Sequence, residues 1–455
     1  MRATSILLLI AAIAAGCTST AKPGPSDRAA GSPSSAAGPS SGPSGSSSAA
    51  DQPGDTPGSD LLLVQRNNLL AVLEGENGRV LYEAPPGTTT SNWQVVYGVT
   101  PRGTTTHVVA GNLIAGGRIE LETDVVGTWV LPTIGLDRAS GGLSLDGRTL
   151  VLAEARPEAT RTRFAILATD FSAPARVITL AGRFTFDGLS PDGSRIYVIE
   201  ELPGKDGKHY AVRSVLTKGT LEDGVIVDKR NSDEAMAGTP IERKSDGAMA
   251  YTLYLGEDGP FVHALDTANR VAFCIDLPAA WGKTGVSLSG WATALTPDRA
   301  SLYVANPGRG LIAEVDLHDL TVARSATFSA TAAFSPTEAL GAATTFNGTT
   351  SVDLVKFTGT PGPAGSAAVS PDGQTLYVLD STGVLLISTS DLKPRTRLLK
   401  DRNIIGLAAS PDGRSLYVVA SDGTGARIDA TSGAVLAPFD GNGYRGIVVV
   451  MREGA

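Results

Sequence analysis

The sequence predicts an all-β protein built from repeated four-stranded units, and three observations support this fold class. Glycine is abundant, with 53 residues among 455, whereas charged residues make up 18 % and aromatic residues 5 % of the chain. A Ser-Pro-Asp-Gly turn pattern recurs along the sequence. Each copy is followed by an apolar run rich in β-branched and aromatic residues, which is typical of a strand. This combination favours a β-rich protein with many tight turns over a helical cytosolic enzyme.

The turn pattern has a direct physical interpretation as the bend of a hairpin. Serine or threonine can accept a backbone hydrogen bond, proline fixes the next position, aspartate tolerates the third, and glycine takes the positive φ that restarts the strand. Close copies begin at Leu189, Val369 and Ala409. Looser or more degenerate copies lie at Leu143–Gly147, Leu295–Asp298, Lys244–Gly247 and Val99–Gly103.

The spacing of these copies predicts a β-propeller. Four strands in about 40–50 residues is the period of one propeller blade. Seven units begin near residues 93, 141, 187, 240, 291, 366 and 406. In addition, Leu61–Glu83 predicts three strands and Gly446–Met451 predicts a fourth. We therefore expect seven or eight four-stranded blades, with eight favoured, and both chain termini sharing one blade so that the ring closes without a long free edge.

These units resemble a known group of repeats. The Ser-Pro-Asp-Gly…Leu-Tyr-Val units, and Tyr303-Val304-Ala305-Asn306 in particular, resemble the YVTN-type and WD40-like repeats of bacterial propellers. That group includes surface-layer proteins, lactonase-type propellers and TolB-like domains, and the resemblance covers most of residues 61–450. It implies the fold but no ligand, because the shared residues lie in turns and packing strands. Lactonase-type propellers use polar residues near the central channel, and none can be matched here one by one.

The N-terminus predicts export and lipid anchoring. Arg2 is followed by an apolar run, Ile6–Ile13, and then by Ala14-Ala15-Gly16-Cys17, which resembles the lipobox of bacterial lipoproteins. We expect residues 1–17 to form a signal peptide ending in the lipidated Cys17, whose acyl chains (palmitate among them) hold the protein on the extracytoplasmic side of the cell membrane. An ordinary secretory signal with an accidental cysteine is the alternative.

The rest of the chain divides into a tether and a folded domain. Residues 18–60 are rich in Ser, Gly, Pro and Ala, so they cannot bury enough surface to offset their ordering entropy and are expected to be disordered. Residues 61–455 form the predicted propeller domain. The formal net charge of −8 argues against a general nucleic-acid partner. If Cys17 carries lipid, Cys274 has no disulfide partner, and its strand-like surroundings predict a buried small side chain.

The sequence contains no established catalytic constellation. The folded region has neither Gly-x-Ser-x-Gly nor His-Glu-x-x-His, and the numerous Asp-Gly pairs are explained by turns instead of calcium loops. The histidines, which are isolated and more typical of surface or strand positions than of ligands, are His107, His209, His263 and His318. We therefore predict no catalytic residue, no metal site and no cofactor.

Three segments remain as candidates for other roles. Trp281 and Trp291 bracket a loop, so they can form an aromatic platform for a sugar or peptide, with blade-to-blade packing as the alternative. The polar run 228–234 predicts a solvated connection. Residues 325–365 predict an inserted loop or extra hairpin, which either decorates a binding surface or is a tolerated surface excursion.

The leading functional hypothesis is a cell-surface propeller that acts as a binding or scaffold module for a protein, peptide or wall glycan of the envelope. The alternative is a lactonase-like or metal-dependent hydrolase with its site at the mouth of the central channel. A third possibility is a subunit of an envelope machine. Three or more carboxylates or histidines converging at the channel mouth would favour the enzyme.

Overall fold

The computed structural model describes residues 60–113, 115–134, 139–158, 160–202, 210–231, 237–256, 258–282, 290–330, 366–380 and 382–452. In this part of the chain the regular structure is β, apart from two single-turn 3-10 helices, η1 (Ala279–Trp281) and η2 (Pro307–Arg309). None of these described residues forms a helix long and apolar enough to span a bilayer. The expected signal peptide, with Cys17, and nearly all of the expected tether lie outside the described residues.

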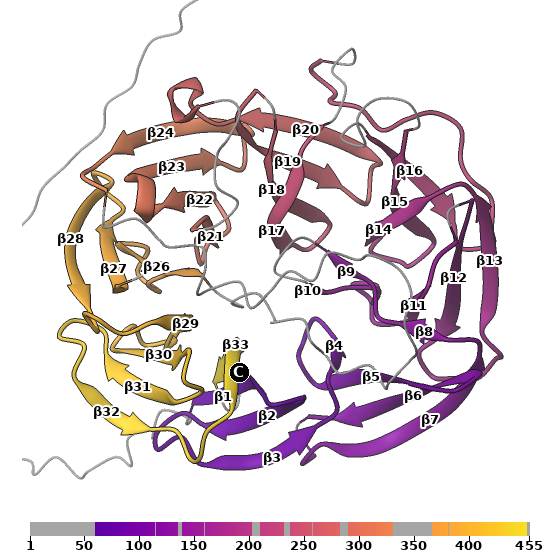
Figure 1. The fold of residues 1–455 in the computed structure, drawn as a ribbon, viewed down its shortest axis with the longest axis horizontal. Helices are drawn as coiled ribbons and strands as arrows, with labels where there is room; N and C mark the ends of the chain where they lie inside the picture. The colour runs from indigo at the N-terminus through magenta and orange to yellow at the C-terminus, as the bar shows by residue number, and fades with distance from the viewer. Residues whose placement is uncertain are drawn as a thin grey trace, which may run out of the picture. The chain divides into compact units, whose positions relative to one another are not determined.

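Eight blades form a closed ring around a central channel (Figure 1), which confirms the predicted fold and the favoured blade count. Blade 1 contains β33 (Tyr444–Arg452), β1 (Asp60–Arg66), β2 (Leu69–Glu74) and β3 (Val80–Ala84). Blade 2 contains β4 (Gly87–Thr89), β5 (Val95–Arg102), β6 (Thr105–Asn112) and β7 (Arg118–Val126). Blade 3 contains β8 (Trp129–Val130), β11 (Thr149–Glu154), β12 (Arg161–Ala168) and β13 (Arg176–Ala181), with the two-stranded hairpin β9 (Thr133–Ile134) and β10 (Ala139–Ser140) beside it.

The other five blades follow in chain order around the ring. Blade 4 contains β14 (Phe184–Leu189), β15 (Arg195–Glu201) and β16 (Tyr210–Leu216). Blade 5 contains β17 (Thr239–Asp246), β18 (Met249–Leu255), β19 (Pro260–Asp266) and β20 (Val271–Asp276). Blade 6 contains β21 (Ala292–Leu295), β22 (Ser301–Asn306), β23 (Leu311–Asp316) and β24 (Thr321–Thr327). Blade 7 contains β25 (Ala367–Val369), β26 (Thr375–Asp380), β27 (Gly383–Ser388) and β28 (Lys393–Leu398). Blade 8 contains β29 (Ile404–Ala409), β30 (Ser415–Ala420), β31 (Gly425–Asp429) and β32 (Val435–Pro438).

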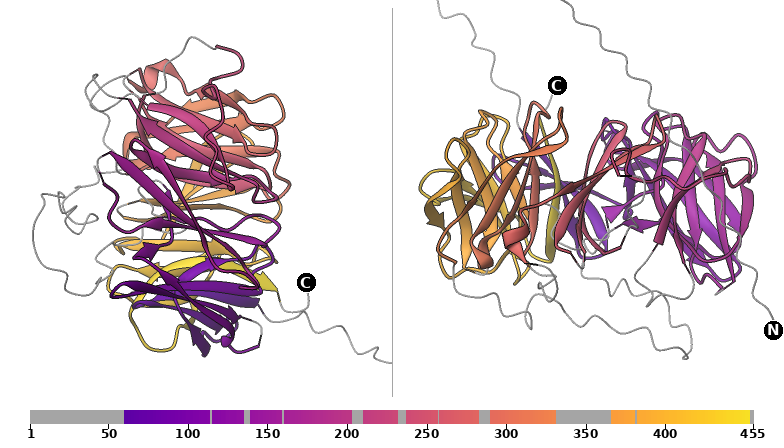
Figure 2. Two further views of the ribbon diagram at one scale, coloured as in Figure 1. Left: turned by 90° about the vertical axis from the view of Figure 1, so that its right-hand side faces the viewer. Right: turned by 90° about the horizontal axis from the view of Figure 1, so that it is seen from above.

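Within each blade the strands are antiparallel neighbours, with the first at the channel and the last at the outer rim (Figure 1). Seen from the side, the strands run between the two faces of the ring (Figure 2). Several strands carry continuous buried apolar runs, such as Leu62–Val64 on β1 and Leu70–Leu73 on β2. Successive side chains of a strand point to opposite faces, so such a run packs against both neighbouring blades. The cores therefore lie between neighbouring blades and not within a single central layer.

Blade 1 is completed by both ends of the folded chain, as predicted. β1 pairs with β33 in antiparallel register, with Leu61 opposite Met451 and Leu63 opposite Val449. Leu63 is fully buried and packs with Val449 and other apolar side chains of blades 1 and 2. The ring is thus closed by hydrogen bonds and apolar packing between segments almost 400 residues apart, without a disulfide.

The recurring turn has the predicted hydrogen bonds. In the Leu189 copy, Ser190 Oγ donates to Asp192 Oδ1 at 2.6 Å and accepts the backbone N–H of Arg195 at 2.9 Å. Gly193 has a φ of 66°. The carboxylate also accepts the backbone N–H of Ser194, and these bonds lower the pKa of Asp192 to about 2, the bond from Ser190 being the largest cause. The same turn joins the first two strands of several other blades, where Ser144, Thr296, Ser370 and Ser410 accept the corresponding N–H.

The predicted turn at Val99–Gly103 is placed wrongly. Those residues belong to β5 and to its bend into β6, the second and third strands of blade 2. The equivalent first turn is Thr90–Trp93, where Thr90 Oγ1 bonds Asn92 and accepts the N–H of Val95 at 3.1 Å. Trp93 takes the positive φ, 57°, that glycine takes elsewhere. Because a tryptophan occupies this position, the turn has no sequence signature.

Two blades depart from the regular pattern. The inner strand of blade 3 is interrupted: β8 pairs with one end of β11, whereas Leu143 bridges Leu150 at the other, and the β9–β10 hairpin lies between them in sequence. Blade 4 has three strands, and its outer position is taken by a segment that only bridges β16, at Val215 with Leu221 and at Val212 with Ile226. Of the predicted 325–365 insertion, residues 331–365 lie outside the described residues.

Candidate functional site

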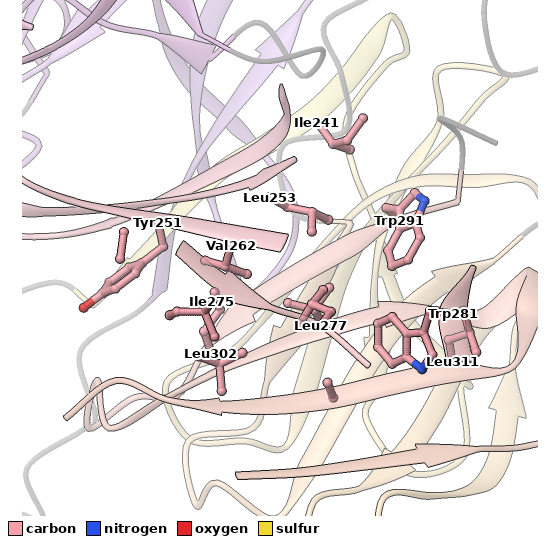
Figure 3. Close-up of a cluster of buried hydrophobic side chains, with 14 residues drawn as sticks. Ile241, Tyr251, Leu253, Val262, Ile275, Leu277, Trp281, Trp291, Leu302 and Leu311 are labelled. Carbon is pink, nitrogen blue, oxygen red and sulfur yellow. The ribbon is translucent and has the colours of Figure 1, made fainter. Parts of the chain in front are cut away.

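Trp281 and Trp291 are packed in the core between blades 5 and 6. Their ring centroids are 5.9 Å apart with an interplanar angle of 39°, and both side chains are buried. Figure 3 shows them among Leu253, Leu277 and Leu311, which come from both blades. This burial matches the alternative of blade-to-blade packing, and the two rings do not form an exposed platform in this structure. Residues 283–289 of the bracketed loop lie outside the described residues.

A buried ion pair connects the inner strands of blades 4 and 5. The side chains of Asp187 on β14 and Arg243 on β17 are 1 % and 6 % exposed. The Arg243 guanidinium donates to the carboxylate and to the main-chain oxygen of Asp187, and its Nε donates to Thr252 Oγ1 at 2.7 Å. Removing two charges from water is costly unless each is paired and hydrogen-bonded. Here the two charges are paired through Asp187 Oδ1, whereas Asp187 Oδ2 is buried without a hydrogen-bond partner among the described residues. The pair therefore fixes blade 4, the incomplete blade, to its neighbour.

A second charged group extends this connection to blades 6 and 7. Glu242, next to Arg243 on β17, lies 2.8 Å from Lys244 Nζ through its Oε1. Its Oε2 accepts the backbone N–H of Thr293 in blade 6 at 2.8 Å and the hydroxyl of Ser366, which precedes β25 in blade 7, at 3.0 Å. The inner polar network, defined as Asp187, Glu242, Arg243 and Lys244, thus has matched charges and bonds four consecutive blades together. These contacts form a structural network between blades that the sequence pattern did not indicate.

A row of polar side chains crosses blade 5 from the channel toward the rim. Arg243, Thr252, His263 and Cys274 are successive cross-strand partners, so they lie on one face of the blade. His263 is fully buried, and neither ring nitrogen has a hydrogen-bond partner. Burial lowers its pKa to about 4, so the imidazole is neutral at pH 7. The ring packs edge-on against Tyr254, with centroids 6.0 Å apart.

At the rim end of this row, the predictions for Cys274 and for the segment 228–234 are only partly correct. Cys274 lies in a strand but is half-buried, and its backbone N–H donates to Asp228 Oδ2 at 3.0 Å. Asp228 is buried, while Lys229 and Arg230 are exposed, so the expected solvated connection 228–234 is wrong at its first residue. Lys229 N–H also donates to Ala272 O, so this segment covers the edge of β20. Residues 232–234 lie outside the described residues.

The other histidines do not join these groups. His107 on β6 lies 3.0 Å from Asp124 and 3.6 Å from Glu122, both on β7. His318 is exposed in a turn, and His209 lies outside the described residues. Across the described ranges, no three His, Cys, Asp or Glu side chains are placed to share a metal ion.

The outer rim contains one strand that differs from the others. β7 has nine residues and pairs only with β6 among the described strands, whereas the outer strands of the other four-stranded blades have four to seven residues. Ile119 and Leu121 on β7 are 48 % and 43 % exposed. Between these and the end of the strand the chain carries Glu122 and Asp124, with no lysine or proline. β7 is therefore a long sheet edge at the outer rim of the ring (Figure 1), and its exposed side chains include apolar and acidic ones.

Four of the other six outer strands in the four-stranded blades carry features that hinder pairing with another chain. β28 includes Pro394 together with basic residues, and β32 is short and ends at Pro438. β24 has Arg324 at its centre, and β20 is covered by Asp228 and its neighbours. Short strands, proline, basic side chains and covering segments are the usual means of protecting sheet edges. β7 has one basic residue, Arg118 at its first position, but it is longer than these strands and contains no proline, and no other described strand pairs with its outer edge. We therefore define it as the rim edge and the candidate binding surface of the protein.

Comparisons with known proteins show the fold and not the function. No family model matches the chain, and no curated protein sequence matches it. The apo structure of AztD from Citrobacter koseri is similar over 86 % of this chain and 97 % of its own, with 12 % identity and a TM-score of 0.50. The dihydro-heme d1 dehydrogenase NirN, solved in complex with DHE, is similar over 88 % of this chain and 77 % of its own, with 14 % identity and a TM-score of 0.52. A common fold thus accompanies neighbours of different function.

Proposed function

We propose that the chain is a lipid-anchored envelope protein whose propeller is a binding module for a protein or peptide partner, docked on the rim edge. The open edge of β7 is the observation that carries this proposal. It combines solvent-exposed apolar side chains, Ile119 and Leu121, with acidic ones in a blade that needs no further strand of its own. The sequence pattern ending at Cys17 supports the anchor on the extracytoplasmic side.

A protein or peptide suits this surface better than a wall glycan. Glycan-binding platforms use exposed aromatic rings, and the two tryptophans considered for that purpose are buried between blades. A sheet edge instead offers backbone N–H and C=O groups, whose natural partner is another peptide backbone. The lactonase-like or metal-dependent alternative requires convergent acidic or histidine side chains. The described part of the chain contains no group of three or more His, Cys, Asp or Glu side chains that could hold a metal ion.

Site-specific photo-crosslinking in cells tests this proposal. A photoreactive amino acid replaces Leu121 on β7 in the full chain, and a matched control carries it at Val177 on β13. Both positions are exposed apolar residues of outer strands, in blades 2 and 3. We expect an adduct of defined mass from position 121 and not from position 177. Equal adducts from both positions, or none from position 121, would contradict a partner docked on β7.

A further inference from the structure

We infer that the rim edge accepts an extended, basic peptide segment, which pairs with β7 as a fifth strand of blade 2. This inference rests on the proposed function, because it specifies the partner and the mode of binding at the same surface. Strand addition of this kind takes affinity from backbone hydrogen bonds and specificity from alternate side chains.

The backbone of β7 presents its free groups at alternate residues. Gly127 N–H donates to Thr104 O at 2.8 Å, just beyond the end of the β6–β7 ladder. Hydrogen-bonded pairs recur every second residue in an antiparallel ladder, so Val125 and Thr123 direct their N–H and C=O groups toward β6. The N–H and C=O groups of Glu122 and Asp124 consequently point away from the sheet. They form the free edge that an added strand would use.

A contact at the end of β7 supports this assignment. Val126, which is two residues from Asp124, is expected to direct its carbonyl outward as well. Trp129 Nε1 donates to Val126 O at 2.8 Å, and Trp129 belongs to β8 and not to β6. The edge is thus already accepting a hydrogen bond from outside its own ladder.

The side chains of β7 define the chemistry of the added strand. Glu122, Asp124 and Ile119 lie on one face of the strand, and Leu121 and Thr123 lie on the other, because the unpaired Glu120 shifts the register between Ile119 and Leu121. The side chains of Glu122 and Asp124 are more than half exposed, although both approach His107. An incoming strand with lysine or arginine at alternate positions would place opposite charges across the pair from Glu122 and Asp124, and apolar residues between them would cover Leu121.

Two other occupants fit this edge less well. A second copy of β7 would place acidic side chains opposite acidic side chains, which destabilises a cross-strand pair. The chain's own 18–60 segment contains only Lys22 and Arg28 as basic residues, and its many prolines lack the N–H that pairing requires. A separate basic segment is therefore the partner that matches both the backbone and the charge of β7.

Fluorescence anisotropy with synthetic peptides tests the inference on the full chain. The probe is a labelled nine-residue peptide that alternates lysine with valine, and the control replaces lysine with glutamate. Two further peptides keep the lysine and valine side chains but are N-methylated at either the lysine or the valine amides. We expect the lysine peptide to bind at least tenfold more tightly than the glutamate peptide. Methylation of the lysine amides should abolish binding, whereas methylation of the valine amides should not, because a lysine opposite Glu122 presents its N–H to that residue's carbonyl.

Matched proline variants separate strand pairing from general attraction. Glu122→Pro removes an outward N–H without breaking the ladder to β6, and Ser325→Pro does the same on β24, where Phe328 N–H donates to Gly310 O. We expect a loss of at least tenfold in affinity for Glu122→Pro and no loss for Ser325→Pro. Equal binding by both variants, or equal binding of the two methylated peptides, would overturn strand addition. If the lysine peptide fails to bind while crosslinking from position 121 persists, strand addition is wrong and the proposed binding function stands.

Discussion

Protonation of His263 should destabilise the fold as the pH falls. This imidazole is fully buried on β19, and neither nitrogen has a hydrogen-bond partner, so the charged form finds no compensation in the folded state. Desolvation is the largest cause of its lowered pKa. Asp187 and Asp228 favour the protonated form and Arg243 opposes it, but these charges do not reverse the effect of burial.

The magnitude follows from the difference between the two states. The pKa is about 4 in the folded protein and 6.5 in the unfolded chain. Above pH 6.5 the imidazole is neutral in both states and the pH has no effect through this group. As the pH falls from 6.5 to 4, the unfolded chain takes up a proton that the folded state does not, so the free energy of unfolding decreases by about 3 kcal/mol at pH 4.

Urea denaturation at pH 7, 5.5 and 4 measures this effect when the wild type is compared with a His263→Leu variant. We expect the wild type to lose about 3 kcal/mol more than the variant between pH 7 and pH 4, because all other titrating groups are shared. His318→Gln is the matched control, since His318 is exposed, and it should keep the wild-type pH dependence. Parallel pH profiles for wild type and His263→Leu would refute the assignment of acid sensitivity to this residue.

Three further changes test other parts of the structure. Asp187→Ala leaves the Arg243 guanidinium buried without its carboxylate and should cost about 3–5 kcal/mol in urea denaturation, whereas an added Arg243→Met change should restore most of the loss; equal stability of single and double variants would contradict this. Leu63→Ala creates a cavity where β1 meets β33 and should lower the free energy of unfolding by about 2–5 kcal/mol, so a loss below about 1 kcal/mol would show that this closure is not tightly packed. Cys17→Ser should abolish labelling by radioactive palmitate and leave the chain unprocessed or released, with an unchanged circular dichroism spectrum; continued labelling would contradict lipidation at Cys17.

The fold could be predicted because its signals are local and repeated. The turn at Ser190 combines a hydroxyl, an aspartate and a positive-φ glycine within a few residues, so each copy marks a hairpin by itself. The closure of blade 1 could be predicted for a related reason. The sequence indicated three strands at the start of the domain and a single strand at its end, which together make one four-stranded blade. The turn at Thr90–Trp93 was missed because Trp93 has the positive φ that glycine has in the other copies, and a tryptophan in the sequence does not indicate a positive φ.

The functional surfaces were less accessible to sequence reasoning. Asp187 and Arg243 are 56 residues apart and belong to different blades, so their pairing depends on how the blades are placed. In the sequence His263 could not be distinguished from any other histidine in a strand. Its predicted effect on stability at low pH depends on its burial and on the lack of hydrogen-bond partners for its ring nitrogens, which only the structure shows. The rim edge could be noticed only after the strands were assigned, because the order of strands decides that Glu122 lies at an edge and not inside a sheet.

Hydrogen exchange along β7 at single-residue resolution tests the central claim most directly. The outward amides of Glu122 and Asp124 should exchange rapidly in the free protein, while those of Leu121 and Thr123 should be protected by β6. Addition of the lysine-valine peptide should slow exchange at the outward amides and leave the inward ones unchanged. If the outward amides exchange at the same rate with and without bound peptide, β7 is not the strand to which the partner adds.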